Sequence, residues 1–162
     1  MHEVIDNFLP RDEFLKIKDV VMGEDFIWTY TPTINAFHED DTCYFTHMMY
    51  LFKGNTYTAT KNFQLIGPIL LRIKPKALIR VKCNLYPKTH TIQNHEPHKD
   101  YNYTHKGALF YLNTCDGYTT LEDDTKIETK ENRMLLFDPS TPHSSTSTTN
   151  AKARFNINFN YF

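Results

Sequence analysis

The fold class of this chain is decided by its last predicted strand, Arg154-Phe155-Asn156-Ile157-Asn158-Phe159-Asn160-Tyr161. Every second residue is aromatic or aliphatic, and the residues between them are an arginine and three asparagines. Because successive side chains of a strand point to opposite faces, one face is apolar and the other polar. The pattern fits a half-exposed strand. It also fits a barrel whose polar face surrounds a polar ligand while the aromatic face packs under helices.

Further strands are predicted upstream of this segment. Residues 77–86 alternate between apolar and other side chains until Pro87 ends the run. Shorter strands are predicted over 107–113 and 133–137, with a turn signal at Asp116-Gly117 between them. From Ala77 onward the sequence therefore indicates an all-β region.

The N-terminal part of the chain has a different pattern. Apolar residues at helical spacing predict a helix over 10–22 and another over 62–73, with a break at Gly67-Pro68. The stretch from Phe26 to Tyr57 is rich in Thr, Tyr and Phe and indicates strands and loops. Helices followed by about eight short strands are typical of a mainly β, α+β fold, a double-stranded β-helix or jelly roll. We expect one domain over 1–162, with helical support over 1–76 and a jelly-roll core over 77–162.

Composition excludes several classes of protein. The 162 residues include 18 Lys and Arg against 19 Asp and Glu, which disfavours a general nucleic-acid binder. No apolar run is long enough to cross a membrane, and the N-terminus lacks the features of a signal peptide. Three cysteines without a Cys-x-x-Cys pair favour reduced thiols. We therefore expect a cytoplasmic protein without membrane partners, and nothing in the sequence indicates its oligomeric state.

The motif His98-Lys99-Asp100 and the distant His143 form a candidate metal site. Residues i and i+2 of an extended segment point the same way, so His98 and Asp100 can reach one ion. His143 would come from a later strand that folds back over the first. Two imidazoles and one carboxylate are the ligand set of mononuclear Fe(II) oxygenases. The other histidines are interpreted as structural or surface residues: His38, His47, His90, His95 and His105.

Four pieces of the segment 79–162, taken in order, resemble the 2-oxoglutarate and Fe(II)-dependent dioxygenases. The resemblance is strongest to their prolyl 4-hydroxylase-like branch, which includes phage-encoded members. The pieces are the strand 81–86 with Pro87, the motif 98–100, the stretch 110–113 with Gly117 and Leu121, and the strand 135–137 with His143 and Arg154. The resemblance implies the jelly-roll fold already favoured by the strand pattern.

The resemblance also implies a role for each site residue. His98, Asp100 and His143 would hold Fe(II), and 2-oxoglutarate would chelate the metal through its keto-acid end. Arg154 and Tyr111 would bind the far carboxylate, and Asn84 or Tyr86 the metal-proximal end. Arg154 lies 11 residues after His143, a slightly longer gap than is usual in the family, so Lys152 is a competing anchor.

The implied activity is hydroxylation of a C–H bond coupled to oxidative decarboxylation of 2-oxoglutarate, with O2 as oxidant and ascorbate as a candidate reductant. A prolyl or other peptidyl residue is the expected substrate, in the host cytoplasm if the chain is phage-encoded. The alternatives are a small-molecule hydroxylase and a catalytically silent metal-binding module of a phage assembly. A nucleic-acid demethylase is disfavoured, since no basic residue follows Arg154. Substrate specificity is expected in 26–57 and 89–96.

Overall fold

The computed structural model describes residues 1–32 and 43–162. The acidic run Glu39-Asp40-Asp41 and His38 therefore lie outside the described residues. The helical elements are α1 (Arg11–Val21), the 3-10 helix η1 (Lys61–Ile66) and α2 (Gly67–Ile73). The strands are β1 (Glu3–Ile5), β2 (Thr29–Thr31), β3 (Tyr44–Lys53), β4 (Thr56–Ala59), β5 (Leu78–Pro87), β6 (Lys106–Tyr111), β7 (Tyr118–Thr120), β8 (Lys126–Glu128), β9 (Arg133–Phe137), β10 (Ser144–Ser145) and β11 (Ala153–Tyr161).

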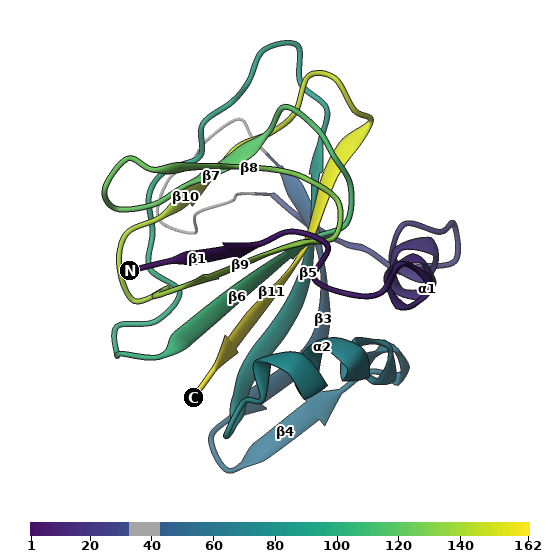
Figure 1. The fold of residues 1–162 in the computed structure, drawn as a ribbon, viewed down its shortest axis with the longest axis vertical. Helices are drawn as coiled ribbons and strands as arrows, with labels where there is room; N and C mark the ends of the chain where they lie inside the picture. The colour runs from purple at the N-terminus through teal and green to yellow at the C-terminus, as the bar shows by residue number, and fades with distance from the viewer. Residues whose placement is uncertain (33–42) are drawn as a thin grey trace.

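Two antiparallel sheets form the body of the molecule, and the jelly-roll prediction is confirmed. The large sheet has the order β1-β9-β6-β11-β5-β3-β2, with β4 paired to β3, and the small sheet has the order β10-β7-β8. The small sheet lies on one side of the large sheet and the helices lie on the other (Figure 1). Isolated bridges pair Asn94 with Thr146 and His98 with His143, so the segment leading to the metal motif runs beside β10.

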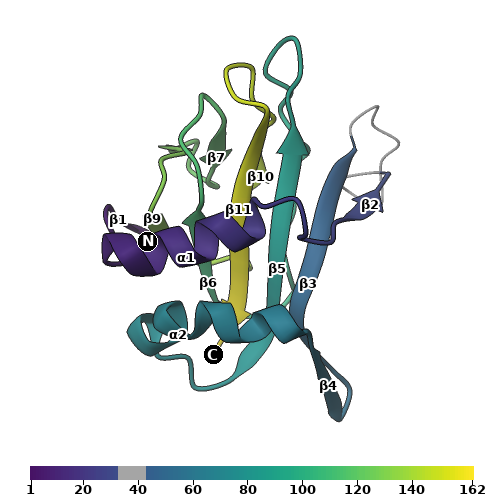
Figure 2. The ribbon, with the colours of Figure 1, turned by 90° about the vertical axis from the view of Figure 1, so that its right-hand side faces the viewer.

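The helices cover the outer face of the large sheet. Figure 2 shows α1 and α2 crossing in front of its central strands. The prediction of a helix over 10–22 is confirmed by α1, and the predicted break at Gly67-Pro68 is the boundary between η1 and α2. Phe14 and Ile17 of α1 are buried in one apolar cluster with Phe159 of β11. Burial of this face fixes the large sheet beneath the helices.

Strand β11 is buried on both faces. Ile157 and Phe159 are fully buried in the cluster under the helices, while the exposed fractions of Arg154, Asn156 and Asn160 do not exceed 1%. The half-exposed interpretation of this strand is therefore wrong, and the barrel interpretation is confirmed. The asparagines face the interior, between the two sheets.

The N-terminal 76 residues are more than a helical support. They supply β1, which pairs with β9 at one edge, and β3, which pairs with β5 in the body of the large sheet. Within the described residues, no helix is long and apolar enough to cross a membrane.

Candidate metal centre and co-substrate pocket

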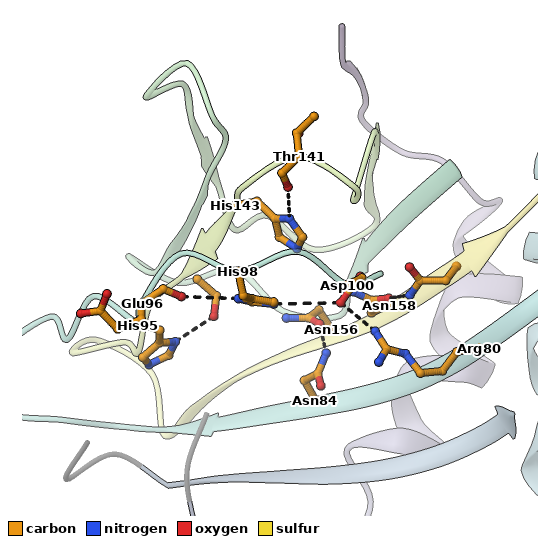
Figure 3. Close-up of polar contacts among 12 residues, drawn as sticks. Arg80, Asn84, His95, Glu96, His98, Asp100, Thr141, His143, Asn156 and Asn158 are labelled. Carbon is orange, nitrogen blue, oxygen red and sulfur yellow. Dashed lines mark hydrogen bonds and ion pairs between the residues drawn. The ribbon is translucent and has the colours of Figure 1, made fainter. Parts of the chain in front are cut away.

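His98, Asp100 and His143 lie together as the sequence predicts. One potential ligand atom from each side chain lies within 4.8 Å of the others, and the described residues contain no other such group. Figure 3 shows the three side chains converging on one point between the sheets. The motif 98–100 lies in a connection rather than within one of the strands, and its backbone is held by pairing with residue 143.

The two histidines are fixed by backbone groups. The N–H of His98 donates to the carbonyl of His143 at 2.9 Å, and the reverse bond measures 3.0 Å. Nδ1 of His143 lies 3.0 Å from the carbonyl oxygen of Thr141. This contact assigns the proton to Nδ1 and leaves Nε2 as a lone-pair donor, as a metal ligand requires. Nδ1 of His98 lies 3.4 Å from the carbonyl oxygen of Glu96, a longer contact of the same kind.

Asp100 is held at both of its oxygens. Oδ1 accepts from Nη2 of Arg80 at 2.7 Å, and Oδ2 accepts from Nδ2 of Asn158 at 3.2 Å. Figure 3 shows both side chains reaching Asp100 from neighbouring strands. Burial raises the pKa of Asp100, but the charges of Arg80, His143 and Lys82 outweigh it and leave this pKa well below its usual range. The carboxylate is therefore ionised before any metal binds.

The protonation state of His98 also suits a metal ligand. Burial, followed by the charge of His143, lowers the pKa of His98 to about 4. The ring is thus neutral at physiological pH, and the metal meets no competing proton there.

Arg154 is a fully buried cation on the inner face of β11. Nε donates to Oγ1 of Thr129 at 2.7 Å, Nη2 to Oγ1 of Thr119 at 2.8 Å, and Nη1 to the carbonyl of Thr146 at 3.2 Å. All three partners are neutral oxygens, and no ion pair joins Arg154 to an acid among the described residues. A buried guanidinium without an acid is costly, so this position is suited to an anionic ligand.

Gly117 makes room for the stem of Arg154. A Cβ at this position would lie 2.8 Å from Cδ of Arg154 and 2.5 Å from the carbonyl oxygen of Ser147. The glycine of the quoted motif therefore lets the arginine lie beneath the small sheet. Lys152, the competing anchor, is exposed.

The tyrosines and Asn84 predicted for the pocket lie around Arg154. The rings of Tyr86 and Tyr111 each have their centroid 5.6 Å from Cζ of Arg154. The hydroxyl of Tyr111 donates to Oγ1 of Thr119 at 2.9 Å, and burial raises the pKa of Tyr111, so this group stays protonated. Asn84 donates to Oδ1 of Asn156 at 2.9 Å, and its own Oδ1 is buried without a hydrogen-bond partner.

The register of β5 against β11 orders these residues along the barrel. Tyr86 lies opposite Arg154, Asn84 opposite Asn156, and Lys82 opposite Asn158. Arg154 is thus separated from Asn158, which contacts Asp100, by one pair of inward-facing residues, Asn84 and Asn156.

Several residues of the site were missed by sequence reasoning. Arg80 and Lys82 share the inner face of β5, and Asn158 lies opposite Lys82. Their alternation with buried Val81 and Cys83 was visible, but it did not show which face was the interior. Asp138, five residues before His143 in the sequence, accepts from the backbone N–H and hydroxyl of Ser140 and therefore caps a turn.

Solved structures identify the fold, although the sequence matches no protein-family model and no curated protein. The viral collagen prolyl hydroxylase of Paramecium bursaria Chlorella virus-1, in complex with 2-oxoglutarate, is 15% identical, with a TM-score of 0.66 over 98% of this chain and 94% of that one. An oxidoreductase of the 2-oxoglutarate-Fe(II) oxygenase family from Burkholderia pseudomallei is 8% identical, with a TM-score of 0.70 over 99% and 84%. The chain has the fold of the 2-oxoglutarate and Fe(II) oxygenases.

This oxygenase fold also carries other reactions. The non-haem α-ketoglutarate-dependent epimerase SnoN of nogalamycin biosynthesis is 11% identical, with a TM-score of 0.64 over 99% of this chain and 77% of that one. Within the oxygenase fold, the residues of this chain fit both implied groups. The imidazole and carboxylate donors suit Fe(II), and Arg154, which has no acid partner among the described residues, suits a carboxylate of 2-oxoglutarate.

Proposed function

We propose that this chain is an Fe(II)- and 2-oxoglutarate-dependent dioxygenase that hydroxylates a C–H bond, with a prolyl or other peptidyl residue as the favoured substrate. Arg154 carries the proposal. Its guanidinium is fully buried and bonds only to neutral oxygens among the described residues. A plain metal-binding module has no use for a second, cationic subsite. A dicarboxylate that reaches from the metal to Arg154 would supply the missing charge.

The metal would be held by Nε2 of the two histidines and by one oxygen of Asp100. Bound Fe(II) would supply the redox chemistry that activates oxygen. The chain itself holds the His98 imidazole neutral and the carboxylate ionised, for the reasons given above. The contacts from Arg80 and Asn158 set the rotation of Asp100, so the ligands are oriented before the ion arrives.

The far end of the co-substrate would be bound by Arg154 and Tyr111. The planar fork of an arginine pairs with a carboxylate through two hydrogen bonds and stays charged at any physiological pH. Asn84 and Tyr86, on the same inner face of β5, would contact the part of the molecule nearer the metal. Burial of these side chains excludes bulk water, which strengthens each electrostatic contact.

The substrate class is the finer part of the proposal. Similarity to a collagen prolyl hydroxylase supports a peptidyl substrate. A second candidate is a small molecule, because an epimerase of nogalamycin biosynthesis shares the fold at a comparable TM-score. These candidates differ in what stimulates turnover, and not in the metal centre.

Succinate formation tests the proposal directly. The purified protein, supplied with Fe(II), O2 and 2-oxoglutarate, is expected to form succinate slowly, with or without ascorbate as reductant. His98→Ala, verified as folded by thermal melting, is the matched control. Acceleration by proline-containing peptides would support the peptidyl substrate, and acceleration by small molecules alone would support the second candidate. Succinate no higher than in His98→Ala would contradict the dioxygenase proposal.

A further inference from the structure

A ladder of side-chain hydrogen bonds joins His105 to Asp100 along the inner face of β11. Asn158 donates to Oδ2 of Asp100 at 3.2 Å. Nδ2 of Asn160 lies 2.6 Å from Oδ1 of Asn158, and Nε2 of His105 lies 2.7 Å from Oδ1 of Asn160. All four side chains are largely shielded, and no more than 8% of Asn158, His105 or Asn160 is exposed. The ladder thus links a residue outside the metal site to one of its ligands.

The hydrogen bonds of this ladder run in one direction, toward Asp100. Asn158 presents its amide nitrogen to Oδ2 of Asp100 and turns its oxygen toward Asn160. Asn160 must then donate to Asn158 and turn its own oxygen toward His105. Reversing either amide would bring two oxygens together in a buried place. Nε2 of His105 must therefore carry a proton.

The second nitrogen of His105 also faces an acceptor. Nδ1 lies 2.8 Å from the carbonyl oxygen of Tyr103, which cannot donate. This contact fixes the ring orientation that turns Nε2 toward Asn160. The rings of Tyr101 and Tyr103 pack against the His105 ring, each with its centroid 5.4 Å away, and help to hold that orientation.

We propose that His105 is a positioning residue of the metal centre, which sets the direction of the ladder through Asn160 and Asn158 and so holds Asp100 in the rotation that binds the metal. The inference rests on the proposed metal site and adds a residue to it that is no ligand. Outer partners of metal ligands typically change metal affinity by about 10- to 100-fold when they are removed.

The isosteric change Asn160→Asp is the sharpest test. The new carboxylate can still accept the hydrogen bond from Nε2 of His105, so the melting temperature should hold. It can no longer donate to Asn158, whose amide must then turn its oxygen toward Asp100. We expect the dissociation constant for Mn(II), a redox-inert stand-in for iron, to rise about tenfold or more by calorimetry.

Substitutions at residue 105 separate the effect of the hydrogen bond that His105 donates from the effect of its side-chain packing. Gln at this position can donate to Asn160, so His105→Gln should keep most of the Mn(II) affinity, whereas His105→Leu should lose it about as far as Asn160→Asp does. The exposed His90 provides the control, since His90→Gln should leave the affinity unchanged. In the unsubstituted protein, nitrogen-15 NMR should show a proton on Nε2 of His105.

The outcomes that overturn this inference differ from those that overturn the proposed function. If His98→Ala binds Mn(II) as tightly as the unsubstituted protein, the proposed metal site itself is contradicted. Binding that depends on His98 but is unchanged in Asn160→Asp would overturn the role of His105 alone. If Asn160→Asp fails to fold, the NMR measurement decides, because a His105 ring without a proton on Nε2 contradicts the ladder.

Discussion

Nη2 of Arg80 lies 2.7 Å from Oδ1 of Asp100, and the two side chains are only 15% and 6% exposed. The pair neutralises the charge of a metal ligand before the metal arrives. It also relieves the cost of burying a carboxylate, which would otherwise raise the pKa of Asp100. The affinity of the site for metal should therefore depend on an arginine that is no ligand.

Arg80→Gln should make metal binding more sensitive to acid. Without this guanidinium, the pKa of Asp100 rises toward and above its usual range, because burial is the largest opposing effect. Protons then compete with the metal at higher pH than before. Titrations with Mn(II) between pH 7 and pH 5 should show a steeper loss of affinity in the variant than in the unsubstituted protein.

Arg133→Gln is the matched control for Arg80→Gln. Arg133 forms an ion pair of 2.6 Å with Asp6, away from the metal ligands. Its removal should lower the free energy of unfolding slightly and leave the pH profile of metal binding unchanged. If Arg80→Gln and the unsubstituted protein have the same pH profile of Mn(II) binding, Arg80 does not set the pKa of Asp100.

Metal binding should require three side chains. His98→Ala, Asp100→Ala and His143→Ala should each lose most of the Fe(II), since two remaining ligands hold a labile ferrous ion poorly. The exposed His90 serves as control, and His90→Ala should keep its iron. The measurement is metal analysis of anaerobically loaded protein. Normal iron content in His143→Ala would contradict the ligand assignment.

Arg154→Leu should separate co-substrate binding from metal binding. Charge-assisted hydrogen bonds contribute roughly 1.5–3 kcal/mol each, so the 2-oxoglutarate dissociation constant should rise by at least about tenfold. Mn(II) affinity without 2-oxoglutarate should barely change. Lys152→Leu should leave both affinities unchanged because Lys152 is exposed. If only Lys152→Leu loses 2-oxoglutarate binding, Lys152 and not Arg154 binds the far carboxylate.

Lys82→Met should stabilise the ligand-free protein. Burial, and then the charge of Arg80, lowers the pKa of Lys82 from 10.5 to about 8. The unfolded chain thus binds the proton more tightly, and below pH 8 the folded protein bears the full cost of the charged amine. We expect a gain of roughly 1–3 kcal/mol at pH 7. Denaturant unfolding should show this gain shrinking as the pH rises from 8 to 10.5.

Residue spacing was enough to predict the last strand and the shared direction of His98 and Asp100, because both depend on local geometry. Side chains two residues apart on an extended backbone point the same way, whatever the fold around them. The length of β3 was harder to predict. Its pairing with β5 shifts register between Met48 and Tyr50, and this irregularity interrupts the alternation that marks a strand.

The supporting residues of the site depend on non-local pairing. Arg80 and Asn158 meet Asp100 only because β5 and β11 pair in one particular register. Nothing near Asn158 in the sequence distinguishes an inward asparagine from a solvated one. The role of His105 likewise requires knowing which atoms face its two ring nitrogens, which the sequence does not contain.

The paired backbone bonds between His98 and His143 exist without any ion, so the ligand frame is assembled in advance. Such a frame holds whichever divalent ion reaches it. Two imidazoles and a carboxylate favour copper over iron, with zinc also ahead of iron in intrinsic affinity. If the site holds iron, its selection must therefore come from the supply of ions and not from the ligands. A correctly folded preparation can be inactive merely because it acquired zinc during expression.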